Sequence, residues 1–317
     1  MTDRPLTLMA VHAHPDDEAT GTGGVLARYA AEGIRTVLVT CTDGRCGDGP
    51  GGVKPGEPGH DPEAVAAVRR TELEAACAVL GVSDLELLDY HDSGMMGWPN
   101  NTEPEAFWNT PVDEAAARLA ELMRRYQPDV VVTYDENGFY GHPDHIQAHR
   151  ITMAAVALTG IPEKVYWTTA PRSMMAEFGR VIAELEEESG VSGTAADQAA
   201  GQADDQSADQ AADRPAGQPE TPAETPAETA DETSAETPEE LEIGLPDEEI
   251  TTWVDVSEFG AAKYEALAAH KSQTESIFFL NLSVERFTKL MGVETFVRVQ
   301  DSTDADLPEN DLFAGLR

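Results

Sequence analysis

The sequence contains little cysteine, and this bears on both the compartment and metal binding. Its three cysteines in 317 residues are Cys41, Cys46 and Cys77. Their odd number argues against a framework of disulfides, so we expect free thiols and a reducing cytoplasm. Four residues separate Cys41 from Cys46 and no second pair exists, so we do not expect a cysteine zinc site.

Positive charge is also scarce. Lysine and arginine together number 21 against 59 acidic residues, which gives a formal net charge of −38. A surface with this charge repels phosphate groups. The composition therefore argues against general binding to nucleic acid or to an anionic membrane.

Long hydrophobic runs are missing as well. No segment approaches the roughly 18 to 20 apolar residues that a membrane span needs. The N-terminal residues Met1–Pro5 are polar, and no basic region with a following apolar run precedes the first predicted strand. We therefore expect neither a membrane span nor a secretory signal.

The first half of the chain alternates apolar segments with amphipathic ones. The predicted strands are Leu6–Val11, Thr36–Cys41, Leu85–Leu88, Val130–Tyr134 and Lys164–Thr168, and the predicted helices are Gly23–Glu32, Pro62–Leu80, Val112–Tyr126 and Pro143–Thr159. This alternation predicts an α/β fold, namely a Rossmann-like, mostly parallel sheet with helices on both faces. In such sheets, binding sites form beyond the carboxyl ends of the strands.

The segment 189–240 interrupts this pattern. From Val191 to Glu240 it has 13 acidic residues, one arginine and a repeated Glu-Thr-Pro-Ala theme. Such a segment cannot bury enough apolar surface to offset its chain entropy, which predicts a disordered, acidic, low-complexity insertion. A solvated linker is the expected role, and a partner-binding or solubility segment is the alternative.

Apolar patterning resumes after the insertion. A strand is predicted at Ile250–Val256, and Ser257 is expected to cap a helix that runs to about His270. We therefore expect one domain formed by residues 1–188 and 241–300, divided by the insertion, with a loose C-terminal tail at 301–317.

A polar cluster, His12-Ala13-His14-Pro15-Asp16-Asp17-Glu18, follows the first predicted strand. Imidazole nitrogen and carboxylate oxygen are ligands that zinc accepts. Asp16 and Asp17 are adjacent and point in different directions, so one can bind a metal while the other faces a metal-bound water. In the alternative, an aspartate caps the following helix and His14 is a loop residue.

A second polar cluster, Asp135 to His145, follows a later predicted strand. Pro143 fits the first turn of a helix, which places His142 at the helix entrance and His145 one turn further in. His149 lies four residues beyond His145, and a histidine pair at this spacing can bind zinc by itself. His149 is therefore a rival ligand, although a core or surface position is the expected one.

Two strands of a parallel sheet would bring both clusters to the same edge. Three protein ligands with an open position for water form the usual catalytic zinc arrangement. Zinc lowers the pKa of its bound water to about 7. A nearby carboxylate can then act as general base, while a histidine or tyrosine stabilises the oxyanion and protonates the departing amine.

The two clusters resemble the motifs of a known family. His-Pro-Asp-Asp at 14–17 and Gly-His-Pro-Asp-His at 141–145 are similar to the signature motifs of the LmbE-like (PIG-L) deacetylases. That family includes the N-acetylglucosaminyl-phosphatidylinositol deacetylases, the bacterial mycothiol-pathway deacetylase and mycothiol S-conjugate amidase. The resemblance covers about residues 6–167 and 246–273, and the acidic insertion departs from the family pattern.

The resemblance implies a role for each matching residue. It implies zinc bound by His14, Asp17 and His145; Asp16 as general base; His142 as acid or oxyanion partner, oriented by Asp144; Tyr140 near the oxyanion; and Arg69 and Asp92 at the substrate. The alternatives are a solvated helix charge for Arg69, with Arg70 as competitor, a turn-forming role for Asp92 and packing for Tyr140. Iron is the alternative metal, and His270 is a further candidate from the late helix.

These observations predict a zinc-dependent deacetylase that hydrolyses the N-acetyl amide of an N-acetylglucosamine-type conjugate, such as N-acetylglucosaminyl-inositol. An amidase resembling the mycothiol S-conjugate enzyme is the alternative within metal hydrolases. A nucleotide-binding Rossmann-like module is disfavoured, because the third glycine of a Gly-x-Gly-x-x-Gly loop would fall at Leu26. A non-catalytic module is disfavoured, because every residue expected for the metal and the general base is present. The expected partner is a small amino-sugar substrate, and a homo-oligomer is left open.

Overall fold

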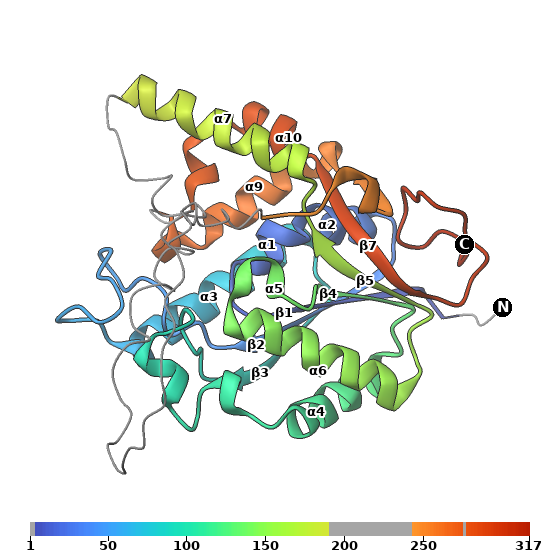
Figure 1. Ribbon diagram of the computed structural model, residues 1–317, viewed down its shortest axis with the longest axis horizontal. Coiled ribbons are helices and arrows are strands. Elements are labelled where there is room, and N and C mark those ends of the chain that lie inside the picture. Colours follow the sequence, from blue (N-terminus) through green and yellow to red (C-terminus); the bar gives the residue numbers. More distant parts are fainter. Residues whose placement is uncertain (1–3, 190–242, 275–276) are drawn as a thin grey trace, which may run out of the picture.

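The computed structural model describes residues 4–189, 243–274 and 277–317, so the predicted insertion lies almost wholly outside the described residues. One seven-stranded sheet, in the order β3-β2-β1-β4-β5-β7-β6, forms the centre of the molecule (Figure 1). The strands are β1 (Thr7–His12), β2 (Arg35–Thr42), β3 (Asp84–Tyr90), β4 (Val130–Tyr134), β5 (Lys164–Thr169), β6 (Thr252–Asp255) and β7 (Val293–Asp301). The five strands β3, β2, β1, β4 and β5, which are neighbours in this order, are parallel. Strand β7 runs antiparallel to both β5 and β6.

Helices cover both faces of the sheet, which confirms the predicted α/β architecture (Figure 1). The helices are α1 (Asp17–Gly21), α2 (Gly23–Ala31), α3 (Pro62–Leu80), α4 (Val112–Tyr126), α5 (Gly138–Gly141), α6 (Pro143–Thr159), α7 (Arg172–Ser189), α9 (Gly260–Ala269) and α10 (Val284–Met291). Tyr29 of α2, Leu73 of α3 and Leu267 of α9 share one apolar core. Leu119 of α4 and Ile151 of α6 belong to a second core on the opposite face.

Local sequence explains where these elements begin and end. Every residue of β1 is buried, as expected for a central parallel strand covered on both faces. Asp61 caps α3 by accepting the N–H groups of Glu63 and Ala64, and Gly81, with φ +70°, ends the helix. None of the helices in the described part of the chain is both long enough and apolar enough to cross a membrane.

The sequence pattern missed β7 and α7. Ser257 also differs from its predicted role as a helix cap, because its hydroxyl donates to Asp255 and a 3-10 turn at Ser257–Phe259 precedes α9.

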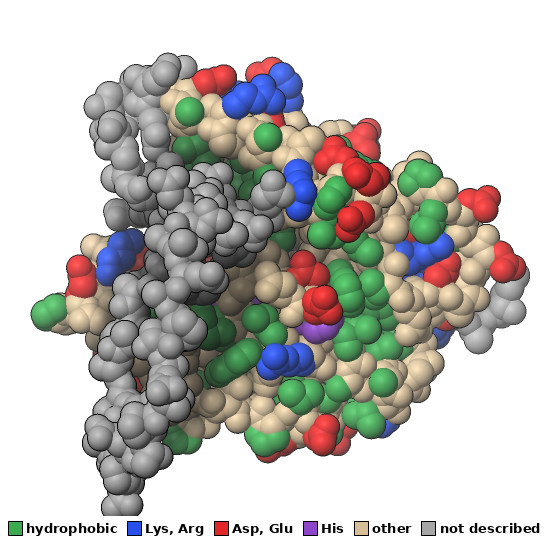
Figure 2. All heavy atoms as spheres, in the orientation of Figure 1, with side chains coloured by type: hydrophobic (Ala, Val, Ile, Leu, Met, Phe, Trp, Pro, Cys, Tyr) green, Lys and Arg blue, Asp and Glu red, His purple; other side chains and the backbone are tan. Residues whose placement is uncertain are grey.

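Acidic side chains are spread over the face of the molecule in Figure 2 and do not form one patch.

The C-terminal residues correct the prediction of a loose tail. Leu312 and Phe313 are completely buried. The Glu309 carboxylate is also buried and is paired with the buried ammonium group of Lys164 on β5. Apolar burial and a charge pair therefore hold this segment against the sheet. Neither interaction could be predicted from the sequence, because the partners are far apart along the chain.

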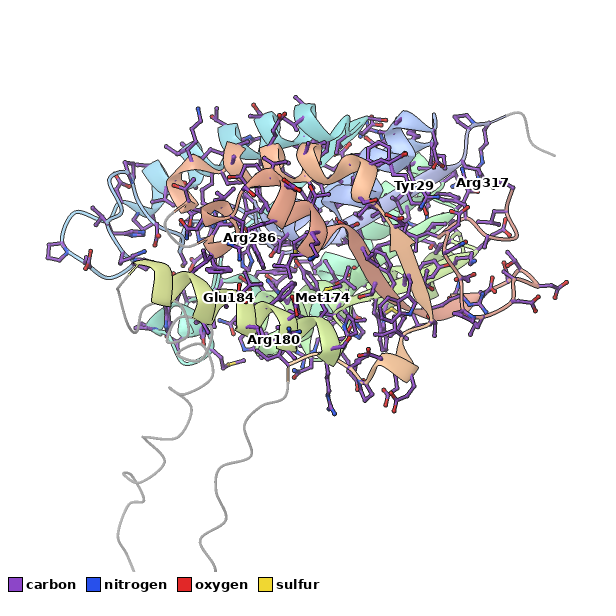
Figure 3. All side chains as sticks on the ribbon, turned by 90° about the horizontal axis from the view of Figure 1, so that it is seen from above. Tyr29, Met174, Arg180, Glu184, Arg286 and Arg317 are labelled. Atoms are coloured by element: carbon purple, nitrogen blue, oxygen red, sulfur yellow. The ribbon has the colours of Figure 1, made fainter. Side chains whose placement is uncertain are left out.

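Asp311 connects this segment to α2. Its carboxylate accepts the Tyr29 hydroxyl at 2.9 Å, the Phe313 N–H at 3.0 Å and the Arg317 guanidinium at 2.9 Å. Figure 3 shows Arg317 beside Tyr29. Burial alone would raise the pKa of Asp311, but the Phe313 N–H, Arg317 and the Tyr29 hydroxyl outweigh it and hold the pKa below the ordinary value.

The variant Asp311→Asn is expected to lower the free energy of unfolding at pH 7 by about 1–3 kcal/mol. A carboxyl whose pKa is lower in the folded state stabilises the fold above its ordinary pKa of about 4, and this contribution is lost as the pH falls further. Urea unfolding at pH 7 and pH 3 should show a smaller loss on acidification in the variant than in the wild type. The exposed Asp306→Asn is the control, and equal pH dependence in both variants would contradict the assignment.

Candidate active site

The two polar clusters meet because β1 and β4 are adjacent parallel strands. Their carboxyl ends place His14, Asp17 and His145 in one buried cluster. The Asp17 Oδ2 atom lies 3.2 Å from Nδ1 of His14 and 3.5 Å from Nε2 of His145. His14 and His145 are 7% and 3% exposed. The three residues expected to bind the metal are therefore gathered around one carboxylate oxygen.

The ring of His145 is held by its surroundings. Its Nδ1 lies 3.2 Å from the Gly138 carbonyl oxygen, which is an acceptor, so Nδ1 carries the proton. The ring also stacks on Tyr134 with 4.2 Å between centroids. Nε2 is buried and has no hydrogen-bond partner within the described part of the chain. This nitrogen therefore presents a lone pair beside Asp17.

Carboxylates surround His14. Its Nε2 lies 3.2 Å from Asp144 Oδ2 and 3.6 Å from Asp92 Oδ1, while Nδ1 faces Asp17. Burial alone would lower the pKa of His14, but Asp92, Asp144 and Asp17 raise it well above the ordinary value. Burial likewise acts to raise the pKa of Asp17, but His145 and His14 hold it well below the ordinary value. The site therefore favours positive charge at its centre.

Asp16 lies in an unusual backbone conformation beside this cluster. Its φ of +107° is in the left-handed region, which is strained for a residue with a side chain. Its N–H donates to Glu18 Oε2 at 2.9 Å. Burial raises the pKa of its carboxyl even though Arg69 opposes the shift. A half-buried carboxylate with a raised pKa suits a general base.

Arg69 holds this turn in place. One terminal nitrogen donates to the Pro15 carbonyl and, at 2.9 Å, to Asp16 Oδ2, and the other donates to the Gly44 carbonyl at 2.7 Å. Its side chain is 5% exposed, whereas that of the competitor Arg70 is 56% exposed. Arg69 is therefore a buried residue that positions Asp16, and its direct contact with substrate stays a prediction.

His142 and Asp144 interact through the backbone of Asp144, and not through its carboxylate. His142 caps α6 because its Nδ1 accepts the Asp144 backbone N–H at 3.1 Å. The Asp144 carboxylate instead accepts the N–H and hydroxyl of Ser93 and faces His14. Burial, with His14 and His145 nearby, places the pKa of His142 well below its ordinary value. Asp144 thus orients His142 through its backbone.

Tyr140 and Asp92 border the same cluster. The Tyr140 ring lies 5.1 Å from that of His145 and 6.1 Å from that of His142, measured between centroids. Burial raises the pKa of Tyr140, so its hydroxyl keeps its proton. Asp92 accepts the Gly94 N–H at 2.8 Å, as a turn-former would, and also faces His14.

Other candidate residues lie behind the cluster. His270 Nε2 is 2.8 Å from Glu18 Oε1, and both side chains are fully buried. His149 Nδ1 is 3.0 Å from the Tyr134 carbonyl oxygen, so it belongs to the packing beside β4. The cysteines are free thiols.

Sequence reasoning missed three supporting residues. Glu18 links Asp16 to His270, Ser93 holds Asp144, and the Tyr134 hydroxyl donates to Asp17 Oδ2 at 2.8 Å. Glu18 stands directly after the first motif and Ser93 directly after Asp92. Nothing local distinguishes Tyr134 from a core residue at the end of β4.

Comparison with known proteins agrees with this geometry. Residues 9–156 match the family model of the GlcNAc-PI de-N-acetylase, PIG-L. A protein of Thermobifida fusca is 40% identical, with 99% of this chain and 100% of the relative covered. One of Acidothermus cellulolyticus is 39% identical, with 98% and 95% covered. Both are named 1D-myo-inositol 2-acetamido-2-deoxy-alpha-D-glucopyranoside deacetylase.

The chain belongs to the PIG-L family. A solved structure of N,N'-diacetylchitobiose deacetylase from Pyrococcus horikoshii shares the fold of this PIG-L protein, with a TM-score of 0.54 and 16% identity. That alignment covers 94% of this chain and 88% of the other.

The residues of this PIG-L chain fit a metal ion. Within the described residues, two groups have ligand atoms close enough to share an ion: His14 with His142 and His145, and His14 with Asp92 and Asp144. The unpartnered Nε2 of His145 and the Asp17 oxygen between two imidazoles supply the nitrogen and oxygen donors that divalent metals take. The site is therefore a His/Asp cluster able to hold a metal ion.

Proposed function

We propose that this chain is a zinc-dependent N-deacetylase that hydrolyses the N-acetyl amide of an N-acetylglucosamine-type conjugate, such as N-acetylglucosaminyl-inositol. The names of the relatives support this substrate class, because they are similar over nearly the whole chain. The observation that carries the proposal is the Asp17 oxygen between His14 and His145, with Asp16 beside it. In this proposal, His14, Asp17 and His145 hold the metal.

The side chains divide the reaction among them. When bound, zinc supplies Lewis acidity and lowers the pKa of a coordinated water. Asp16 accepts a proton from the attacking water and later delivers it to the departing amine. His142 receives a hydrogen bond on Nδ1, so Nε2 carries the ring proton and can donate to the oxyanion. Tyr140 keeps its hydroxyl proton and assists at the same oxygen.

Metal removal and replacement tests the proposal. Purified protein should release acetate from N-acetylglucosaminyl-inositol, lose this activity after chelation and regain it with zinc. Parallel reconstitution with Fe²⁺ identifies the preferred metal. A thiol-conjugated glucosaminyl amide distinguishes the amidase alternative, because it would release a larger acid. Absence of acetate release from fully metal-loaded protein would contradict the deacetylase assignment.

The variant Arg69→Lys tests how the turn at Asp16 is held. A single ammonium group cannot replace a planar guanidinium that donates to three oxygens, so Asp16 should lose its alignment. We expect kcat to fall about tenfold while KM changes less than about threefold. The neighbouring, exposed Arg70→Lys is the control. A raised KM with unchanged kcat would instead indicate direct substrate binding.

A further inference from the structure

A cavity of about 260 Å³ lies beside the metal-binding cluster, beyond the carboxyl ends of β1, β4 and β5. Asp17, Tyr140 and His145 form part of its wall. Most of the exposed surface of the wall is apolar, and its large apolar side chains are Phe139, Met174, Met175, Phe178, Phe279 and Met291. Threonine side chains, among them Thr168 and Thr169, add hydroxyl groups to this wall. The proposed reaction centre therefore opens directly into an apolar space.

The charged groups in this wall already have partners. Lys263 Nζ is 2.7 Å from Glu294 Oε1. The Glu294 carboxylate also accepts the N–H groups of Gly24 and Val25 at the start of α2. The Tyr134 hydroxyl donates to Asp17. The Thr169 hydroxyl in this wall is buried and has no partner within the described part of the chain, so it can offer a ligand one hydrogen bond. A ligand rich in hydroxyl groups would still lose more hydration here than it regains, which is unfavourable.

An amide at the cluster has two substituents, and their chemistry decides which one faces the cavity. The amine side carries a sugar covered with hydroxyl groups, and the acyl side is a hydrocarbon. We propose that the cavity is an acyl pocket and that the chain also hydrolyses glucosamine-type amides with straight aliphatic acyl groups longer than acetyl. This inference rests on the proposed function.

Volume sets the length of the acyl group. A methyl or methylene group is about the size of a water molecule, whose share of liquid volume is roughly 30 Å³. The methyl group of an acetyl amide therefore leaves most of the 260 Å³ empty. At this size per carbon, the cavity takes a chain of up to roughly eight carbons.

Helix α7 forms an adaptable side of the pocket. Met174, Met175 and Phe178 of α7 line it and are each partly exposed. Figure 3 shows Met174 on this helix, and an ion pair between Glu184 and Arg286, at 3.0 Å, connects α7 to α10. Methionine side chains are flexible and fit apolar ligands of different shapes.

The longer amides react by the same balanced step as the acetyl amide. The oxygen of water forms a bond to the carbonyl carbon, and the carbon–nitrogen bond breaks. A straight-chain carboxylic acid and a free amine leave: the amine nitrogen takes up the proton that Asp16 removed from water, and the second proton of the water leaves with the acid, which ionises to the carboxylate in solution. No oxidant, reductant or further reactant is needed.

The test compares N-acetyl, N-butanoyl, N-hexanoyl and N-octanoyl forms of one glucosaminyl-inositol. We expect kcat/KM to rise with chain length, by up to about fourfold per methylene, until the cavity is full. Met174→Trp should lower kcat/KM for the hexanoyl substrate at least about tenfold more than it lowers kcat/KM for the acetyl substrate. Ala176→Trp, at an exposed position of the same helix, is the matched control and should behave as the wild type.

Calorimetry gives a readout that is independent of turnover. Hexanoate should bind the wild type more tightly than acetate does, and Met174→Trp should abolish the difference. Met174→Ala, which enlarges the pocket, should shift the preference toward octanoyl. Acetyl hydrolysis with declining activity toward longer chains and no hexanoate preference would overturn the acyl pocket. No hydrolysis of any amide, with hexanoate still preferred, would instead overturn the proposed function.

Discussion

Replacing Asp16 with Asn is expected to lower kcat about 10³-fold with little change in metal content. Asparagine keeps the shape of the side chain and can still accept a hydrogen bond from Arg69, but it cannot take a proton from water. Asp16 is not one of the proposed metal ligands: its carboxylate accepts a hydrogen bond from Arg69, and its backbone N–H donates to Glu18. The loss should therefore fall on proton transfer and not on metal binding.

Steady-state kinetics and metal analysis of the same preparation check this prediction. The variant should retain the zinc content of the wild type and a KM within about threefold of it. Asp113→Asn, at an exposed position of α4, is the matched control for the loss of a carboxylate. A variant that retains zinc and normal activity would remove Asp16 from the mechanism.

Replacing Lys164 with Met is expected to lower the free energy of unfolding by about 3–5 kcal/mol. The Lys164 ammonium and the Glu309 carboxylate are both fully buried. Without Lys164, Glu309 keeps the Tyr166 hydroxyl at 2.8 Å and Arg298 at 2.7 Å, but it loses its most buried charge partner. A stability of 5–15 kcal/mol is usual for a domain, so this single change removes a large part of it.

Denaturant unfolding of single and double variants measures the pair. Lys164→Met combined with Glu309→Gln should be less destabilised than the sum of the two single variants, because the double variant removes both buried charges of the pair together. Lys289→Met, exposed on α10, should stay within about 0.5 kcal/mol of the wild type. A loss below about 1 kcal/mol for Lys164→Met would show that the pair is not a major source of stability.

The sequence was most informative where function depends on neighbours along the chain. The clusters at 12–18 and 135–145 each follow a strand, and sheet topology alone brings adjacent parallel strand ends together. The residues that meet there could therefore be predicted without knowing any distance. Whether each one has its predicted role is a matter for the variants described above.

Interactions between distant segments could not be predicted in the same way. Glu18 and His270 are 252 positions apart, and Lys164 and Glu309 are 145 apart. Nothing in the local pattern around either residue names its partner. The polar sequence after Val299 gave no sign that Leu312 and Phe313 enter the core. Arg69 illustrates a related gap, because its helix position did not reveal that its guanidinium faces the Pro15–Asp16 turn.

The distance along the chain between Lys164 and Glu309 has a consequence for synthesis on the ribosome. The strand that carries the ammonium group emerges 145 residues before the carboxylate that neutralises it. Until then, nascent polypeptide cannot close its sheet around that charge without a large desolvation cost. A translation product cut short before Glu309 would therefore remain open to proteases, because the sheet around Lys164 closes only when the segment that contains Glu309 has been made.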